Sequence, residues 1–233
     1  MCAEAFRGGE GVKYSGELST QAKAGWVRLS HGWRVWCASR RGPYIVRDFL
    51  RPAVRAVPSA IVSRLPRCEI LLAPQIDACS VASRWTVNEC SLEITLATQG
   101  VEPHDLALEV LVCIGQVLWD ALRDTEQRAW LGVLATEIDG DVTGEIDEDA
   151  LAEKRKLMAS AAGSRSRRRL EAYARASFAG TAAEYVHALW HDVTVRSGPD
   201  YLTARHLRIR LKFLASMFPP DAGYRLFSME RAQ

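Results

Sequence analysis

The chain of 233 residues lacks the long apolar segments that membrane and secreted proteins carry. No stretch reaches the ~18 apolar residues of a membrane-spanning helix, and residues 1–16 contain no apolar core of a signal peptide. The formal net charge of +2 is too small to argue by itself for binding to nucleic acid or to a membrane surface. These absences favour a cytoplasmic protein without a membrane partner, and they do not favour a nucleic-acid partner.

Paired cysteines and phosphate-binding loops are also absent. The six cysteines stand singly, which excludes a zinc ribbon and a thioredoxin-type Cys-x-x-Cys motif. They are Cys2, Cys37, Cys68, Cys79, Cys90 and Cys113, and we expect reduced thiols. No Gly-rich phosphate loop and no Gly-x-Ser-x-Gly elbow occurs. The sequence predicts no cofactor.

The remaining composition, 48% hydrophobic and 25% charged, is that of a globular domain, and the length allows one large core. Residues 1–25 are rich in glycine and polar groups. Residues 26–40 contain two short apolar-polar alternations that are compatible with a hairpin. Residues 1–47 are therefore predicted to be a flexible or partly β N-terminal arm.

The folded domain is predicted over 48–220, followed by a C-terminal tail at 221–233. Apolar residues at helical spacing predict a helix over 48–64, and alternation predicts strands near 68–73 and 91–97. Further helices are expected at 105–122, 125–138, 147–162, 165–193 and 201–217. This order predicts an α+β fold, mostly helical, with a small sheet and with the apolar helix 105–122 buried at its centre.

Six polar residues of this central helix fall within one stripe of roughly 80°, at about 100° per residue. They are Asp105, Glu109, Cys113, Gln116, Asp120 and Arg123. One interpretation is a helix with a single solvent-facing edge. The other is a stripe that lines a cleft, and the candidate cleft residues are then Glu109, Cys113, Gln116 and Asp120.

Two segments resemble the zinc-binding motifs of zincin-like metallopeptidases of the lethal-factor type. Val112-Cys113-Ile114-Gly115-Gln116 occupies the place of the His-Glu-x-x-His pentapeptide. In that motif two histidines on one helix face bind Zn²⁺, and the glutamate takes a proton from the metal-bound water. Ala176-Ser177-Phe178-Ala179-Gly180 resembles the Glu-x-Phe-Ala-Glu segment and keeps its central Phe-Ala pair. Ala176 and Gly180 stand where the third zinc ligand and a supporting glutamate would be.

The resemblance covers about residues 48–220 and implies a zincin-like domain that has lost its metal chemistry. A catalytic zinc needs about three protein ligands, and Val112, Gln116 and Ala176 supply none. Cys113 replaces the catalytic glutamate. The resemblance therefore implies an inactive pseudo-metallopeptidase that acts by binding a peptide or protein. The peptide is expected beside strand 91–97, taken to be the edge of the sheet.

Other interpretations stay open. The chain could be a hydrolase with a relocated site, using a non-standard metal site or Cys113 as nucleophile. No histidine can be assigned to activate that thiol, although His104 lies about two and a half turns upstream. The basic run Arg165–Arg169 could bind nucleic acid or a phosphoprotein, or it could form a solvated helix face. Both motifs could also be accidental features of an unrelated helical domain.

Two further clusters carry incomplete metal-binding patterns. Residues 139–150 resemble an EF-hand calcium loop, whose candidate ligands are Asp139, Asp141, Thr143 and Glu145. The last position of that loop should be a bidentate glutamate and is Ala150. Glu184, His187 and His191 lie within about 60° on one helix face, without a further ligand that the sequence could identify. The sequence predicts no bound metal.

Overall fold

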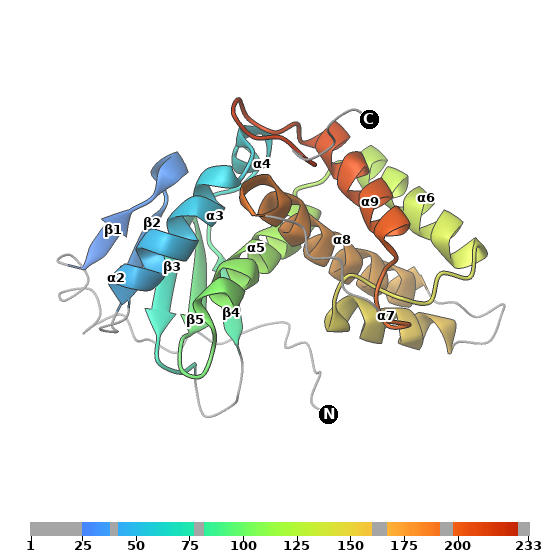
Figure 1. The fold of residues 1–233 in the computed structure, drawn as a ribbon, viewed down its shortest axis with the longest axis horizontal. Coiled ribbons are helices and arrows are strands. Elements are labelled where there is room, and N and C mark those ends of the chain that lie inside the picture. Colours follow the sequence, from blue (N-terminus) through green and yellow to red (C-terminus); the bar gives the residue numbers. More distant parts are fainter. Residues whose placement is uncertain (1–24, 38–41, 77–81, 160–166, 192–197, 228–233) are drawn as a thin grey trace.

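The computed structural model describes residues 25–37, 42–76, 82–159, 167–191 and 198–227. These residues form the predicted α+β fold, in which helices predominate and a single five-stranded sheet lies at one end of the molecule (Figure 1). The rest of the predicted N-terminal arm and of the C-terminal tail lies outside the described residues, as do Cys2, Cys79 and Arg165.

The sheet has the order β1-β2-β3-β5-β4. Its strands are β1 (Trp26–Arg28), β2 (Arg34–Cys37), β3 (Arg67–Ala73), β4 (Ser83–Val87) and β5 (Ser91–Ala97). Strands β2, β3 and β5 are parallel to one another, whereas β1 and β4 pair antiparallel at the two edges. The strands predicted near 68–73 and 91–97 are confirmed. The hairpin predicted within 26–40 forms as β1 and β2, and it belongs to the same sheet.

The predicted edge position of strand 91–97 is wrong. β5 lies between β3 and β4, and β4 forms the edge on that side. The sequence pattern did not reveal β4 because its residues are exposed or half-buried, so they show no alternation of buried apolar positions. The two central strands, by contrast, each bury every second residue against the helices. These buried residues are Cys68, Ile70 and Leu72 in β3 and Leu92, Ile94 and Leu96 in β5.

The helices from residue 46 onward follow the predicted order, and two short helices before them were not predicted. They are η2 (Ser30–Gly32), α2 (Gly42–Ile45), η3 (Val46–Leu50), α3 (Arg51–Ala56), α4 (Ser59–Val62), α5 (Pro103–Asp120), α6 (Asp124–Asp139), α7 (Glu148–Met158), α8 (Arg167–Trp190) and α9 (Ala204–Met217). The helix predicted over 48–64 is interrupted at Val57, which is extended because the residue before a proline avoids the helical region. Helix α5 is buried along most of its length, as predicted for the central helix.

Helices α5 and α8 pack antiparallel at the centre of the molecule (Figure 1). Their opposite ends meet: His104 contacts His187 at one end, and Asp120 pairs with Arg175 at the other. Gly115 allows the two backbones to approach closely, because a Cβ atom there would lie 2.7 Å from Ala179 Cα. Helices α6, α7 and α9 pack around α8 on the side away from the sheet (Figure 1). The segments that resemble the two peptidase motifs therefore lie on neighbouring helices.

Candidate functional site

The residues at the three zinc-ligand positions are half-buried on the facing helices α5 and α8. Val112 and Gln116 lie on α5, and Ala176 lies on α8. The Arg175 guanidinium donates to the Gln116 carbonyl at 3.4 Å and also pairs with the Asp120 carboxylate. The candidate cleft residue Asp120 is thus an exposed ion-pair partner that links the two helices.

Two other candidate cleft residues, Glu109 and Cys113, turn toward the edge strand β4. The Cys113 thiol donates to Ser83 Oγ at 3.5 Å, and that hydroxyl donates to the Glu109 carboxylate at 2.5 Å. Cys113 is only 2% exposed. Burial raises the pKa of its thiol to about 12, and the nearby Glu109 carboxylate adds to the shift against the Ser83 hydrogen bond. Because the reactive form of cysteine is the thiolate, this geometry argues against Cys113 as a nucleophile.

Gly180, where the supporting glutamate of the peptidase segment would be, has no room for a side chain. A Cβ atom there would lie 1.9 Å from a carboxylate oxygen of Asp147. Asp147 is the N-cap of α7 and accepts from the Ala150 amide at 2.8 Å. The start of α7 therefore packs directly onto α8 at the position of the missing carboxylate.

The loop that resembles an EF-hand does not gather its four candidate calcium ligands. Asp139 and Asp141 are exposed, and Thr143 donates to the Pro199 carbonyl at 3.5 Å. Glu145 is instead 1% exposed and turned into the protein. Its carboxylate already pairs with two cations, Arg210 and Lys154, which would repel Ca²⁺. The loop thus lacks the bidentate ligand at Ala150, and Glu145 acts as an ion-pair partner inside the protein instead of a calcium ligand.

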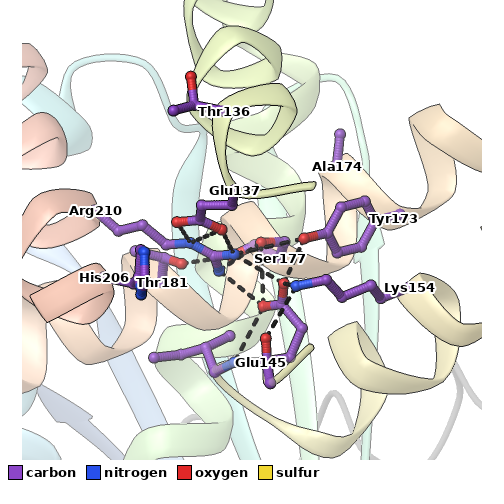
Figure 2. Close-up of polar contacts among 12 residues, drawn as sticks. Thr136, Glu137, Glu145, Lys154, Tyr173, Ala174, Ser177, Thr181, His206 and Arg210 are labelled. Carbon is purple, nitrogen blue, oxygen red and sulfur yellow. Dashed lines mark hydrogen bonds and ion pairs between the residues drawn. The ribbon is translucent and has the colours of Figure 1, made fainter. Parts of the chain in front are cut away.

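The carboxylate of Glu145 belongs to a buried charge network that joins four helices (Figure 2). Arg210 of α9, with no exposed surface, donates to Glu145 and to Glu137 of α6. The network is completed by Lys154 of α7 and by Tyr173 and Ser177 of α8. Burial opposes the ionisation of Glu145, but the charge and hydrogen bonds of Arg210, together with Lys154 and Tyr173, outweigh it and lower the pKa of the carboxyl to about 2.

This network holds two carboxylates and two cations in mutual contact, so its charges are balanced and its polar groups are satisfied. Replacing a whole buried ion-pair network by apolar residues is often neutral for stability, whereas removing one partner is strongly destabilising because it leaves a buried charge unpaired. Sequence reasoning missed it, because Arg210 sits in the alternation Arg208-Ile-Arg-Leu, where an exposed position is the ordinary expectation. We assign the network to the packing of α6, α7, α8 and α9.

Three of the five histidines of the chain gather where α5 begins and α8 ends. They are His104, His187 and His191, and one ring nitrogen from each lies within 4.8 Å of the others. The Nε2 atoms of His104 and His187 are 3.0 Å apart. The ring of His187 stacks on that of His191, with centroids 5.1 Å apart. His187 is buried and His191 is exposed, so the cluster extends to the surface of the protein.

The outer nitrogens of the first two histidines point at carboxylates. His104 Nδ1 lies 3.7 Å from Asp105, and His187 Nδ1 lies 3.5 Å from Glu184. The predicted trio Glu184, His187 and His191 is therefore brought together only in part. His191 lies beside His187 in the cluster, whereas Glu184 lies near the outer nitrogen of His187. The third member of the cluster is His104 of α5. The sequence could not reveal His104 as a partner, because the contact spans 83 residues.

Basic side chains gather at two other places. Arg167, Arg168 and Arg169 of the predicted basic run begin α8 and are exposed. Separately, a hollow of about 690 Å³ beside β1 and β2 is lined by Trp26, Arg28, Leu29, His31, Gly32, Arg34 and Arg67. Within it, Arg34 pairs with Glu69 at 2.5 Å and covers the Trp26 ring. The guanidinium of Arg34 therefore already has partners within the protein.

Within the described part of the chain, the histidine cluster and the edge strand β4 are the features from which a function can be argued. No family model, curated protein or solved structure matches the chain. The function has to be argued from the geometry of these two features. Within the described residues, no helix is long and apolar enough to cross a membrane.

Proposed function

We propose that the chain is a metallopeptidase-like domain that binds an extended peptide along β4 and does not hydrolyse it. The observation that carries this proposal is the open edge of the sheet. Among the described residues β4 pairs with β5 alone. An edge strand presents unpaired backbone donors and acceptors, to which an extended peptide can add as a further strand.

The backbone hydrogen bonds of β4 identify which residues face the open edge. The Ala97 amide donates to the Ala82 carbonyl at 2.9 Å, and the Asn88 amide donates to the Ser91 carbonyl at 2.8 Å. Because antiparallel partners alternate between bonded and non-bonded pairs, Arg84 and Thr86 also bond to β5. The main-chain groups of Ser83, Trp85 and Val87 therefore point outward.

The metallopeptidase-like part of the proposal rests on the pairing of α5 with α8. Two motif-like segments, far apart in sequence, lie on antiparallel helices whose backbones touch at Gly115 and Ala179. Helix α5 is also joined to β4 through Cys113, Ser83 and Glu109. A peptide on β4 would thus run beside the helix that carries the altered pentapeptide. Valine and alanine offer no metal ligand there, which supports binding without turnover.

The test uses Val87, which is 45% exposed and whose amide faces the open edge. Val87→Pro removes that donor without removing a bond to β5, and Val87→Thr is the matched control that keeps it. We expect the full chain to bind members of a fluorescent peptide library and to leave them intact. Val87→Pro should weaken binding about tenfold, the worth of one hydrogen bond, and Val87→Thr should leave it within about twofold. Equal affinities of the two variants, or cleavage that a chelator abolishes, would contradict the proposal.

A further inference from the structure

We propose that His104, His187 and His191 form a binding site for a divalent transition metal, with Zn²⁺ as the first candidate. The inference does not depend on peptide binding at β4. It rests on the geometry of three imidazoles from two helices, on the carboxylates near two of them, and on one buried nitrogen, His187 Nδ1, that has no hydrogen bond within the described residues.

The spacing of the nitrogens suits a single metal ion. Zinc binds imidazole nitrogen at about 2.0–2.1 Å in tetrahedral geometry, so two ligand nitrogens stand roughly 3.4 Å apart. The Nε2 atoms of His104 and His187 are 3.0 Å apart, and one ligand atom from each of the three histidines lies within 4.8 Å of the others. Small side-chain rotations would bring these distances to the required value.

The three side chains are also held by regular structure. His187 and His191 are four residues apart, and the His191 amide still donates to the His187 carbonyl at 2.9 Å, so both rings project from the same face of α8. His104 follows Pro103 in the first turn of α5. The cluster therefore joins the first turn of α5 to the last turn of α8.

The outer side of the cluster has the pattern of a metal site. A metal-binding histidine ordinarily turns its second nitrogen to a carboxylate, which fixes the tautomer and makes the ligand more basic. The Nδ1 atoms of His104 and His187 lie 3.7 and 3.5 Å from the carboxylates of Asp105 and Glu184, near enough for such a contact after a small rotation of the side chains. His187 Nδ1 is buried and has no hydrogen-bond partner among the described residues, although buried polar atoms usually have one.

The donor set indicates which metals the site would take. Three imidazoles without a thiolate suit zinc, nickel or copper. With three protein ligands and an exposed His191, the fourth position is open to water.

The experiment is a titration of the full chain, stripped with a chelator and dialysed, with Zn²⁺ and with Co²⁺. We expect one equivalent of each to bind, and the cobalt complex to show the absorption of a tetrahedral nitrogen site without a thiolate charge-transfer band. His104→Gln and His191→Gln change partly or fully exposed residues, so the fold should persist, and each should weaken binding by about tenfold or more. Glu184→Gln should weaken it by about tenfold through His187.

His206→Gln is the matched control, since His206 lies on α9 and contacts Thr203. It should bind metal as the parent does. Circular dichroism of each variant checks the fold. The inference is overturned if the parent binds no more metal than the His104→Gln, His191→Gln double variant. It is also overturned if both single variants bind as tightly as the parent, or if the cobalt spectrum shows a thiolate ligand.

Discussion

The ionised form of Asp147 destabilises the folded protein. Burial, together with the nearby Asp149 and Glu145 carboxylates, raises the pKa of Asp147 to about 6, against the Ala150 amide that favours the ionised form. The folded chain therefore holds this proton more tightly than the unfolded chain. The associated stability is present below the unfolded pKa of about 3.9 and is lost as the pH rises through about 6.

Asp147→Asn should remove this cost, because asparagine also caps a helix and carries no charge. We expect the variant to be more stable than the parent by about 1–2 kcal/mol at pH 8, with the advantage disappearing between pH 6 and pH 4. Urea denaturation at a series of pH values measures the difference. A constant difference across this range would show that the ionisation of Asp147 does not set its contribution.

Single residues were predictable where their own neighbours along the helix determine the outcome. The apolar spacing of helix 105–122 predicts buried positions such as Val110 and Ile114, and both are buried. Cys113 was placed in the polar stripe of the same helix, so its burial was not predicted. Glu145 was not predictable, since an acidic residue in a polar loop is ordinarily exposed. Its inward orientation depends on Arg210, which lies 65 residues away. The charge of a partner, and not the local pattern, decides where such a residue lies.

Helix packing can be tested at two glycines. A Cβ atom at Gly115 would meet the Ala179 backbone at 2.7 Å, whereas a Cβ atom at Gly132 of α6 would meet nothing within 4 Å. We expect Gly115→Ala to destabilise the protein by about 1–3 kcal/mol, because the helices must separate. Gly132→Ala should stabilise it by about 0.5–1 kcal/mol through helix propensity. Chemical denaturation of both variants decides, and equal shifts would contradict the close contact of α5 with α8.

Elements were predictable from periodicity to the extent that one face is buried. The predicted helices from 105 to 217 and the strands near 68–73 and 91–97 were found because apolar residues recur at the helical or strand period. β4 was missed because both of its faces are partly exposed. The helix predicted over 48–64 is interrupted at Val57 because Pro58 follows it. The prediction used the apolar spacing alone and did not take this proline into account.

At the scale of the whole molecule, the sequence could not reveal which helix faces meet. The histidine cluster needs the start of α5 to lie beside the end of α8, and the charge network needs four helices to converge (Figure 2). Both depend on long-range packing. The position of β4 at the edge depends on the crossing from β3 to β5. The two motif-like segments lie on the paired helices α5 and α8, and their resemblance to the peptidase motifs stays a prediction.

The most direct test of the metallopeptidase-like framework is to restore its three metal ligands. Val112→His, Gln116→His and Ala176→Glu would be combined with His104→Gln and His191→Gln, which remove the competing histidine cluster. Cys113 is kept, because a buried glutamate in its place would lie near Glu109. The measurement is zinc bound per chain after dialysis, compared with the His104→Gln, His191→Gln parent. The framework predicts one additional equivalent of zinc, since three side chains converging on one point suffice to hold the ion. A variant that is folded by circular dichroism and binds no additional zinc would contradict it.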